Sequence, residues 1–260
     1  YVQKVGRMVA EHSHRQELIY RFYVLDDPEV NAFALPGGYI YVHRGLLAYL
    51  DSEAQLAAVL GHEIAHVTAR HAVRQQRNSV LANVLGILAG VYGGSRLFYD
   101  LANIGGVALV AGYGRDLELE ADRLGAQYLV KSGYPAESML DVLGVLKNQD
   151  AYAQARAKAQ GRKVQSYHGL FASHPENDDR LQEVIAESKK LALQTHPATN
   201  ADKNKDHYKR GDYLARIEGM VFGESVEQGV QRGQTFYHRD LKIKLTAPEN
   251  WHLENLPDKI

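Results

Sequence analysis

The stretch Ser52-Glu-Ala-Gln-Leu-Ala-Ala-Val-Leu-Gly-His-Glu-Ile-Ala-His-Val67 decides the fold of this chain. Ser52 and Gln55 have the spacing of a helix-initiating capping box, and apolar residues then recur at intervals of three and four. We therefore predict a helix from about residue 52 to residue 76.

The same stretch contains a metal-binding pattern, His62-Glu63-Ile64-Ala65-His66. Residues four apart share one helix face, so both imidazoles can reach one cation. Glu63 lies about 100° around the helix, which suits a general base beside the metal better than a ligand. A chain of this composition would contain the pattern by chance only about 0.03 times.

A third ligand can come from two directions. One zincin class adds a third His six positions after the second, beyond a turn. Here His71 follows His66 by five positions and would lie off the metal face of a continuous helix. We expect His71 to have a structural or supporting role.

The other direction is a downstream helix, predicted from about 114 to 131. It offers Glu118 and Asp122 at i and i+4. Glu118 is suited to bind the metal, and Asp122 to orient a ligand histidine through its distal N–H. Glu120 points elsewhere on that helix, and we expect it to serve as a control residue.

The other predicted elements surround this pair of helices. Two short β-prone runs, 31–35 and 39–42, flank Pro36-Gly-Gly and predict a hairpin. Further elements are expected as a helix within 1–18, a strand from Ile19, helices near 136–148, 178–194 and 208–219, an exposed helix or arm at 150–166, and strands near 234–247. The expected fold class is mainly α (α+β), with a small antiparallel sheet beside the metal helix and a small mixed C-terminal extension.

Composition limits the function. The 260 residues include no cysteine, which excludes disulfides, thiolate metal sites and a thiol nucleophile. The formal charge of -1 gives no basic field for nucleic acid. We expect a metallopeptidase domain at 1–196, a linker at 197–207 and the extension at 208–260.

Residues 80–113 form an apolar, Gly-rich insert in two halves of about 12 to 14 residues, while a membrane span needs about 20. Two buried or interfacial helices are favoured over a membrane hairpin or a mobile flap. Peripheral membrane contact through 80–113 remains compatible with this pattern.

The motifs HEIAH, EADRLGA (120–126) and SHPENDDR (173–180), with NAFALPGGYIYVHRGLL (31–47), resemble one family. It is the family of zinc endopeptidases that includes the CAAX prenyl proteases, HtpX and the periplasmic protease BepA. The resemblance implies one zinc per chain, held by His62, His66 and Glu118. It implies Glu63 as catalytic acid/base and Asp122 as the residue that orients a ligand histidine.

Further roles also follow from the resemblance. The run from Asn31, including Ala32 and Phe33, would be the edge strand along which a polypeptide substrate lies extended. His174 would lie at the active site, either as an oxyanion donor or at the fourth zinc position. Arg180 would bind a substrate carbonyl or anchor the His174 loop.

The expected function is zinc-dependent endoproteolysis in cell-envelope quality control, with a periplasmic or other envelope location, because no segment matches the long membrane helices of the integral members. The C-terminal run resembles an extension of longer members, and we expect part of that module to lie beyond Ile260. An alternative is a latent, protease-like chaperone or assembly factor, covered by 80–113 or 150–166. A purely structural zinc site is disfavoured because it would have no use for Glu63.

Overall fold

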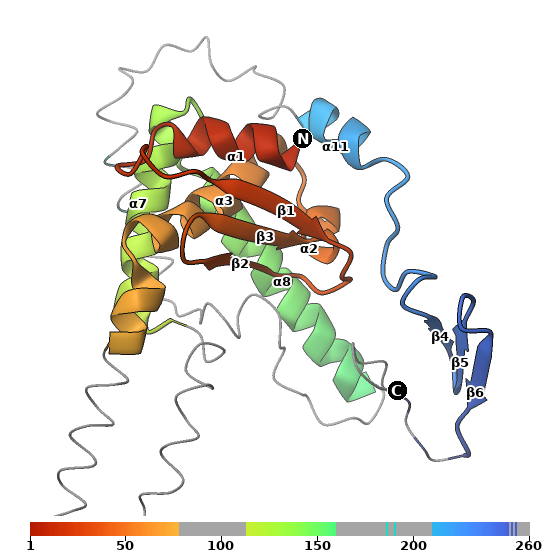
Figure 1. The fold of residues 1–260 in the computed structure, drawn as a ribbon. Coiled ribbons are helices and arrows are strands. Elements are labelled where there is room, and N and C mark those ends of the chain that lie inside the picture. The colour runs from red at the N-terminus through yellow and green to blue at the C-terminus, as the bar shows by residue number, and fades with distance from the viewer. Residues whose placement is uncertain are drawn as a thin grey trace, which may run out of the picture.

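The computed structural model describes residues 1–77, 113–159 and 210–249, together with the single residues 186, 190, 251 and 253. The helices are α1 (Val2–Ala10), α2 (Arg44–Tyr49), α3 (Glu53–Thr68), α7 (Arg115–Lys131), α8 (Ser138–Ala159) and α11 (Arg210–Ile217). The strands are β1 (Arg21–Leu25), β2 (Ala32–Leu35), β3 (Tyr39–His43), β4 (Val230–Arg232), β5 (Thr235–His238) and β6 (Ile243–Thr246). The result is an α+β fold (Figure 1).

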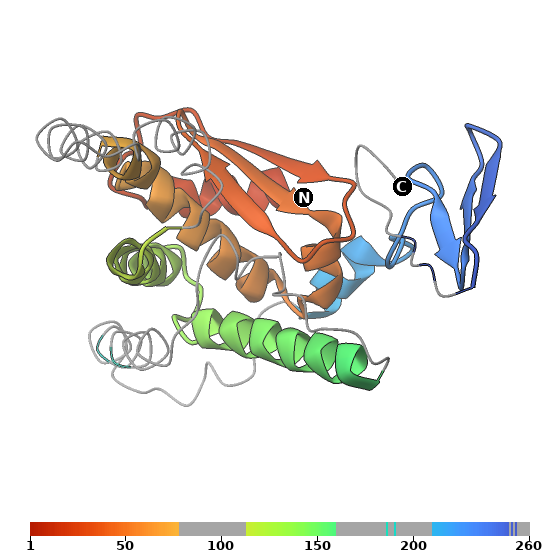
Figure 2. The same cartoon turned by 90° about the horizontal axis from the view of Figure 1, so that it is seen from below.

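Helix α3 is the centre of the fold. It begins as predicted: the Ser52 hydroxyl accepts a hydrogen bond from the Gln55 backbone N–H at 3.2 Å. All 16 of its residues are buried, because the sheet lies on one side and α7 and α8 on the other (Figure 2). A helix buried all round is a core element rather than a surface one.

The predicted helix from 52 to 76 is interrupted. α3 ends at Thr68, Arg70 has a left-handed φ of 57°, and residues 71–77 are helical again. The Arg70 N–H bonds to the Val67 carbonyl at 3.1 Å, three residues back, which tightens and ends the helix. The spacing of apolar residues does not reveal a left-handed backbone at a residue other than Gly. The helical pattern in the sequence therefore runs across a break that only the structure shows.

The first sheet differs in part from the predicted antiparallel one. The hairpin of β2 and β3 is antiparallel as expected, with Ala34 opposite Ile40. β1, however, pairs with β3 in parallel, so the strand order is β1-β3-β2 and the sheet is mixed. Turn residues after β1 indicate where the chain changes direction, but they do not determine which strand it later pairs with.

The chain after residue 209 returns to the first part of the fold. Tyr213 of α11 is fully buried and donates a hydrogen bond to the Leu47 carbonyl at 2.6 Å. Arg44 binds Asp26 and the backbone carbonyls of Val221 and Gly223. Beyond these contacts, β4, β5 and β6 form a wholly antiparallel sheet.

Several predicted features lie outside the described residues, namely most of 80–113, the linker 197–207, and the residues His174 and Arg180. The predicted arm at 150–166 is helical as far as Ala159, where α8 ends. In the part of the chain that is described, none of the helices combines the length and apolar character needed to cross a bilayer.

Two glycines set the distance between α3 and α7. A Cβ on Gly125 would lie 3.1 Å from the His62 backbone nitrogen, and one on Gly61 would lie 3.3 Å from the Gly125 carbonyl oxygen. The two backbones therefore meet one residue away from the first histidine of the motif. This close approach brings the start of α7 over the face of α3 that carries His62 and His66.

We expect Gly125→Val to destabilise the protein by about 1–3 kcal/mol, because its side chain would push α7 away from α3. Urea unfolding measures the loss. Gly144→Ala is the matched control, since a Cβ there meets nothing within 4 Å and Ala favours a helix. Equal stability of the two variants would contradict this account of the helix contact.

Candidate metal centre

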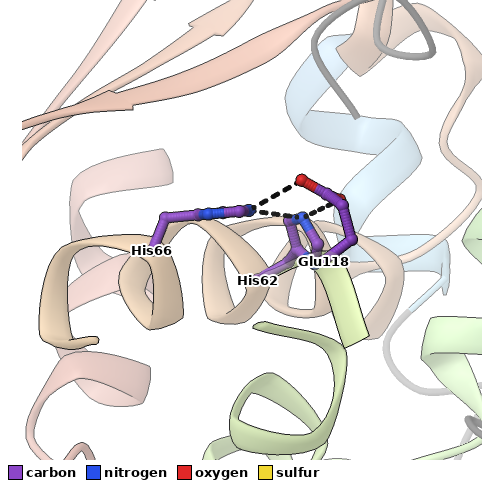
Figure 3. A group of neighbouring side chains, drawn as sticks. All are labelled: His62, His66 and Glu118. Atoms are coloured by element: carbon purple, nitrogen blue, oxygen red, sulfur yellow. Dashed lines mark hydrogen bonds and ion pairs between the residues drawn. The ribbon is translucent and has the colours of Figure 1, made fainter. Parts of the chain in front are cut away.

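The two motif histidines point to the same place. The Nε2 atoms of His62 and His66 lie 2.9 Å apart on one face of α3, and both residues are buried. The spacing of four along a helix places the two rings on the same face, as the sequence predicts. Both imidazoles thus offer the Nε2 atom to a common point (Figure 3).

Glu118 reaches the same point from the first turn of α7. Its carboxylate oxygens lie 3.4 Å from His62 Nε2 and 3.6 Å from His66 Nε2. One ligand atom from each of the three residues lies within 4.8 Å of the others. Donors that share a tetrahedral zinc ion at about 2.0–2.2 Å would be about 3.3 Å apart. The predicted ligand set is therefore brought together in a geometry that a small adjustment would complete.

The electrostatics of this cluster also fit a cation. Glu63, Glu118 and Asp122 carry buried carboxylates, each 2% exposed or less. Burial disfavours the His62 imidazolium, but hydrogen bonds and charges from Asp122 and Glu118 outweigh burial and raise the His62 pKa to about 10. Buried negative charge needs a compensating positive charge, and two imidazoles with a carboxylate form a donor set suited to zinc.

Asp122 contacts the first of the predicted ligands. Its Oδ1 lies 2.9 Å from His62 Nδ1, one helical turn after Glu118. A carboxylate at this atom keeps the proton on Nδ1 and leaves the Nε2 lone pair free for a metal. The position of Asp122 is the one that the i, i+4 spacing predicted.

The second predicted ligand also has a neighbour, His71, for which the sequence analysis expects a structural or supporting role. His71 Nδ1 lies 2.8 Å from His66 Nδ1, and His71 is fully buried. Burial lowers the His71 pKa, against the charge of Glu120. The helix break at Arg70 causes this contact, because a continuous helix would direct residue 71 away from residue 66.

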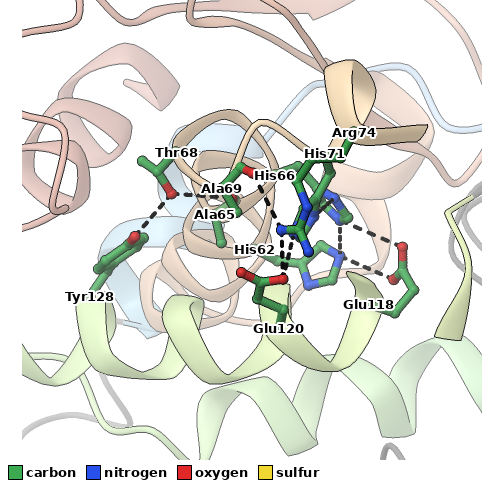
Figure 4. Close-up of polar contacts among 10 residues, drawn as sticks. All are labelled: His62, Ala65, His66, Thr68, Ala69, His71, Arg74, Glu118, Glu120 and Tyr128. Carbon is green, nitrogen blue, oxygen red and sulfur yellow. Dashed lines mark hydrogen bonds and ion pairs between the residues drawn. The ribbon is translucent and has the colours of Figure 1, made fainter. Parts of the chain in front are cut away.

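Glu120 is not the bystander that the sequence suggested. It stays outside the ligand cluster, as predicted, but its Oε2 lies 3.4 Å from His71 Nε2 and accepts a hydrogen bond from Arg74 at 2.7 Å (Figure 4). It is therefore connected to His66 through His71, and it is unsuitable as an inert control.

Tyr113 also lies at this site, and no motif in the sequence identifies it. Its ring stacks on His66, with centroids 4.1 Å apart and an interplanar angle of 18°. Burial and the nearby carboxylates of Glu63 and Glu118 raise the pKa of Tyr113 well above its usual value. The stacking covers one face of the His66 ring and limits its rotation.

The strand predicted to bind substrate lies at an edge of the first sheet. Among the described residues β2 pairs with β3 alone, in the order β1-β3-β2, and it packs beside α3. Phe33 stacks on Tyr41 at 5.1 Å, while the Asn31 carbonyl accepts a hydrogen bond from the His43 N–H at 2.9 Å. A cavity of about 370 Å³ lies between the end of β2 and α3, and its lining includes Ala34, Leu35, His66 and Tyr113.

A second group of possible metal ligands occurs within the described residues: Asp27, Glu29 and His43. His43 Nδ1 lies 3.6 Å from Asp27 and 3.7 Å from Glu29. Both carboxylates are about one-third exposed, unlike those of the first cluster. This group connects the loop after β1 to the end of β3.

Comparison with known proteins gives a consistent result. The model of peptidase family M48 matches residues 1–188. The beta-barrel assembly-enhancing protease of Escherichia coli K12 is 30% identical over 80% of this chain, and that of Yersinia pestis is 29% identical over 85%. The mitochondrial metalloendopeptidase OMA1 of Schizosaccharomyces pombe is 35% identical over 48% of the chain. The matches span 41%, 43% and 37% of these relatives, so the chain spans less than half the length of each.

We expect about one tightly bound zinc per chain, lost in His62→Ala, His66→Ala and Glu118→Ala, because two remaining ligands cannot hold the ion tightly. Metal analysis after dialysis measures the zinc content of each variant. Asp116→Ala removes an exposed carboxylate from the same turn of α7 and should leave the zinc content unchanged. A full equivalent of zinc in Glu118→Ala would show that the third ligand lies elsewhere.

Proposed function

Because the chain belongs to peptidase family M48, we propose that it is a zinc-dependent metalloendopeptidase with His62, His66 and Glu118 as metal ligands. The observation that carries this proposal is the convergence of two imidazole Nε2 atoms and a buried carboxylate on one point. Three protein ligands leave a fourth position open, as catalytic zinc sites require. The presence of a buried glutamate beside the first ligand favours catalysis over a structural role.

Zinc, when bound, supplies Lewis acidity that polarises the scissile carbonyl and makes water more acidic. Glu63 then acts as the general base: its carboxylate takes a proton from the attacking water and passes it to the leaving amine nitrogen. Its position next to His62 on α3 and its 1% exposure support this assignment. A buried carboxylate is less well solvated than a surface one, which favours proton uptake.

Asp122 contributes by orientation. By accepting the His62 Nδ1–H, it keeps this ring in the tautomer that offers Nε2 to zinc. For His174 and Arg180 the proposal rests on the family resemblance alone. His174 would serve as oxyanion donor or occupy the fourth zinc position, and Arg180 would bind a substrate carbonyl or anchor the His174 loop.

The proposed substrate is a polypeptide in extended conformation. An edge strand offers unpaired backbone N–H and C=O groups, and a peptide can add to it as a further strand. In the part of the chain that the structure describes, the outer edge of β2 at Ala32 and Phe33, which follow Asn31, lies beside α3 and leads to the cavity next to His66. Such a peptide would pass along the metal-bearing helix.

The proposed biological setting is protein quality control in the cell envelope. Relatives named for the enhancement of β-barrel assembly support it. The same names support an alternative, in which the chain acts chiefly as a chaperone or assembly factor. Both proposals retain the zinc ligands, so the chemical step itself must discriminate between them.

We expect Glu63→Gln to keep zinc and stability while lowering casein hydrolysis by about 10²–10⁴-fold, because the amide cannot accept the proton. Zinc content, thermal unfolding and fluorescent casein cleavage measure the three properties. Glu11→Gln, an exposed change of the same kind, is the control. Hydrolysis at the wild-type rate by Glu63→Gln would move the base elsewhere.

The alternative predicts a different result in cells. If Glu63→Gln replaced the wild-type chain fully in envelope-protein assembly, despite its lost hydrolysis, assembly rather than proteolysis would be the main function. Loss of assembly together with hydrolysis would favour the protease.

A further inference from the structure

We propose that His71 and Glu120 are positioning residues for the zinc ligand His66, linked as His66–His71–Glu120–Arg74. The inference rests on the proposed function, because it takes His66 as a ligand. It adds two residues that neither the metal-binding motif nor the i, i+4 spacing on α7 identifies.

The direction of the hydrogen bond between His66 and His71 follows from the positions of the three proposed ligands. His66 Nε2 faces His62 and Glu118, so this atom must offer its lone pair to zinc. A neutral imidazole then carries its proton on Nδ1. His71 Nδ1, at 2.8 Å from His66 Nδ1, is therefore the acceptor.

The direction of the second contact follows from the first. If Nδ1 of His71 accepts, its proton must be on Nε2. That nitrogen is buried and lies 3.4 Å from Glu120 Oε2, which is within ion-pair distance although the geometry falls short of a hydrogen bond. The carboxylate is held in turn by Arg74 at 2.7 Å. If His66 Nε2 binds zinc, the ring nitrogens that carry the protons of His66 and His71 are thus both determined.

The backbone turn at Arg70 makes the contact between His71 and His66 possible. Arg70 occupies the left-handed region at φ 57°, a conformation that is unfavourable for a residue other than Gly. The resulting turn brings His71 back against the ring of His66 (Figure 4). A packing role alone would not require two ring nitrogens to meet at hydrogen-bond distance.

Helix α7 would then support both histidine ligands as well as supply the third ligand. Asp122 contacts His62 directly, whereas Glu120 reaches His66 through His71. Acceptors at the distal nitrogen of a metal-bound histidine typically change metal affinity by about 10–100-fold. His71 and Glu120 should therefore act on zinc affinity more than on folding.

The test compares zinc affinity across matched variants of the full chain. His71→Leu removes the acceptor, whereas His71→Asn restores an acceptor oxygen near the position of Nδ1. Glu120→Ala removes the terminal carboxylate, and Asp116→Ala removes an exposed carboxylate from the same helix. Competition with a chromophoric chelator gives the zinc affinity, the visible spectrum of the Co²⁺ form reports ligand geometry, and thermal unfolding of the metal-free chains reports folding.

We expect His71→Leu to weaken zinc binding about 10–100-fold and to alter the Co²⁺ spectrum, with His71→Asn recovering most of both. Glu120→Ala should weaken binding about tenfold, and Asp116→Ala should not change it. Wild-type affinity in both His71→Leu and Glu120→Ala would overturn the proposal. So would a loss in His71→Leu that His71→Asn does not restore.

These readouts are independent of hydrolysis. A wild-type chain that binds zinc through His62, His66 and Glu118 but cleaves no casein would refute the proposed activity, while the affinity series would still test the positioning role.

Discussion

The contact between α3 and α7 is the constraint on which the site depends. Gly61 and Gly125 let the two backbones approach until a Cβ on Gly125 would lie 3.1 Å from the His62 nitrogen. This distance matters because Glu118 is a short side chain and must reach two imidazoles on another helix. The metal cluster therefore depends on close packing of small residues as much as on the motif itself.

The cost of this arrangement is electrostatic. Three carboxylates and three imidazoles, of His62, His66 and His71, are buried close together. Each of the histidines meets a hydrogen-bonding or charged neighbour, and buried charges are tolerated only under that condition. In the proposed arrangement, the same neighbours also select the ring nitrogen that carries the proton. The contacts that stabilise these buried side chains would thus also orient the histidines for metal binding.

The edge strand and the helix form one unit. β2 packs beside α3, and the cavity between them includes His66 and Tyr113. Because β3 lies at the centre of the sheet, one edge of β2 is unpaired among the residues that the structure describes. A peptide added to that edge would extend a sheet that already packs against α3, the helix of His62 and His66.

Much of the fold around α3 and of the candidate site could be predicted from the sequence. The capping residues Ser52 and Gln55 predicted the start of α3, and the spacings within HEIAH and between Glu118 and Asp122 predicted the cluster, because these signals are local and repeat with the helix period. The Pro36-Gly-Gly turn predicted the β2–β3 hairpin for the same reason.

The break at Arg70, the parallel pairing of β1 with β3, the stacking of Tyr113 and the link from His66 to Glu120 were decided only by the tertiary structure. Each depends on contacts between segments whose spacing along the chain follows no period. The sequence alone determined which residues could bind a metal together, because a helix places them by its geometry. Tertiary packing decided what holds those residues in place, because the supporting side chains come from a turn and a second helix.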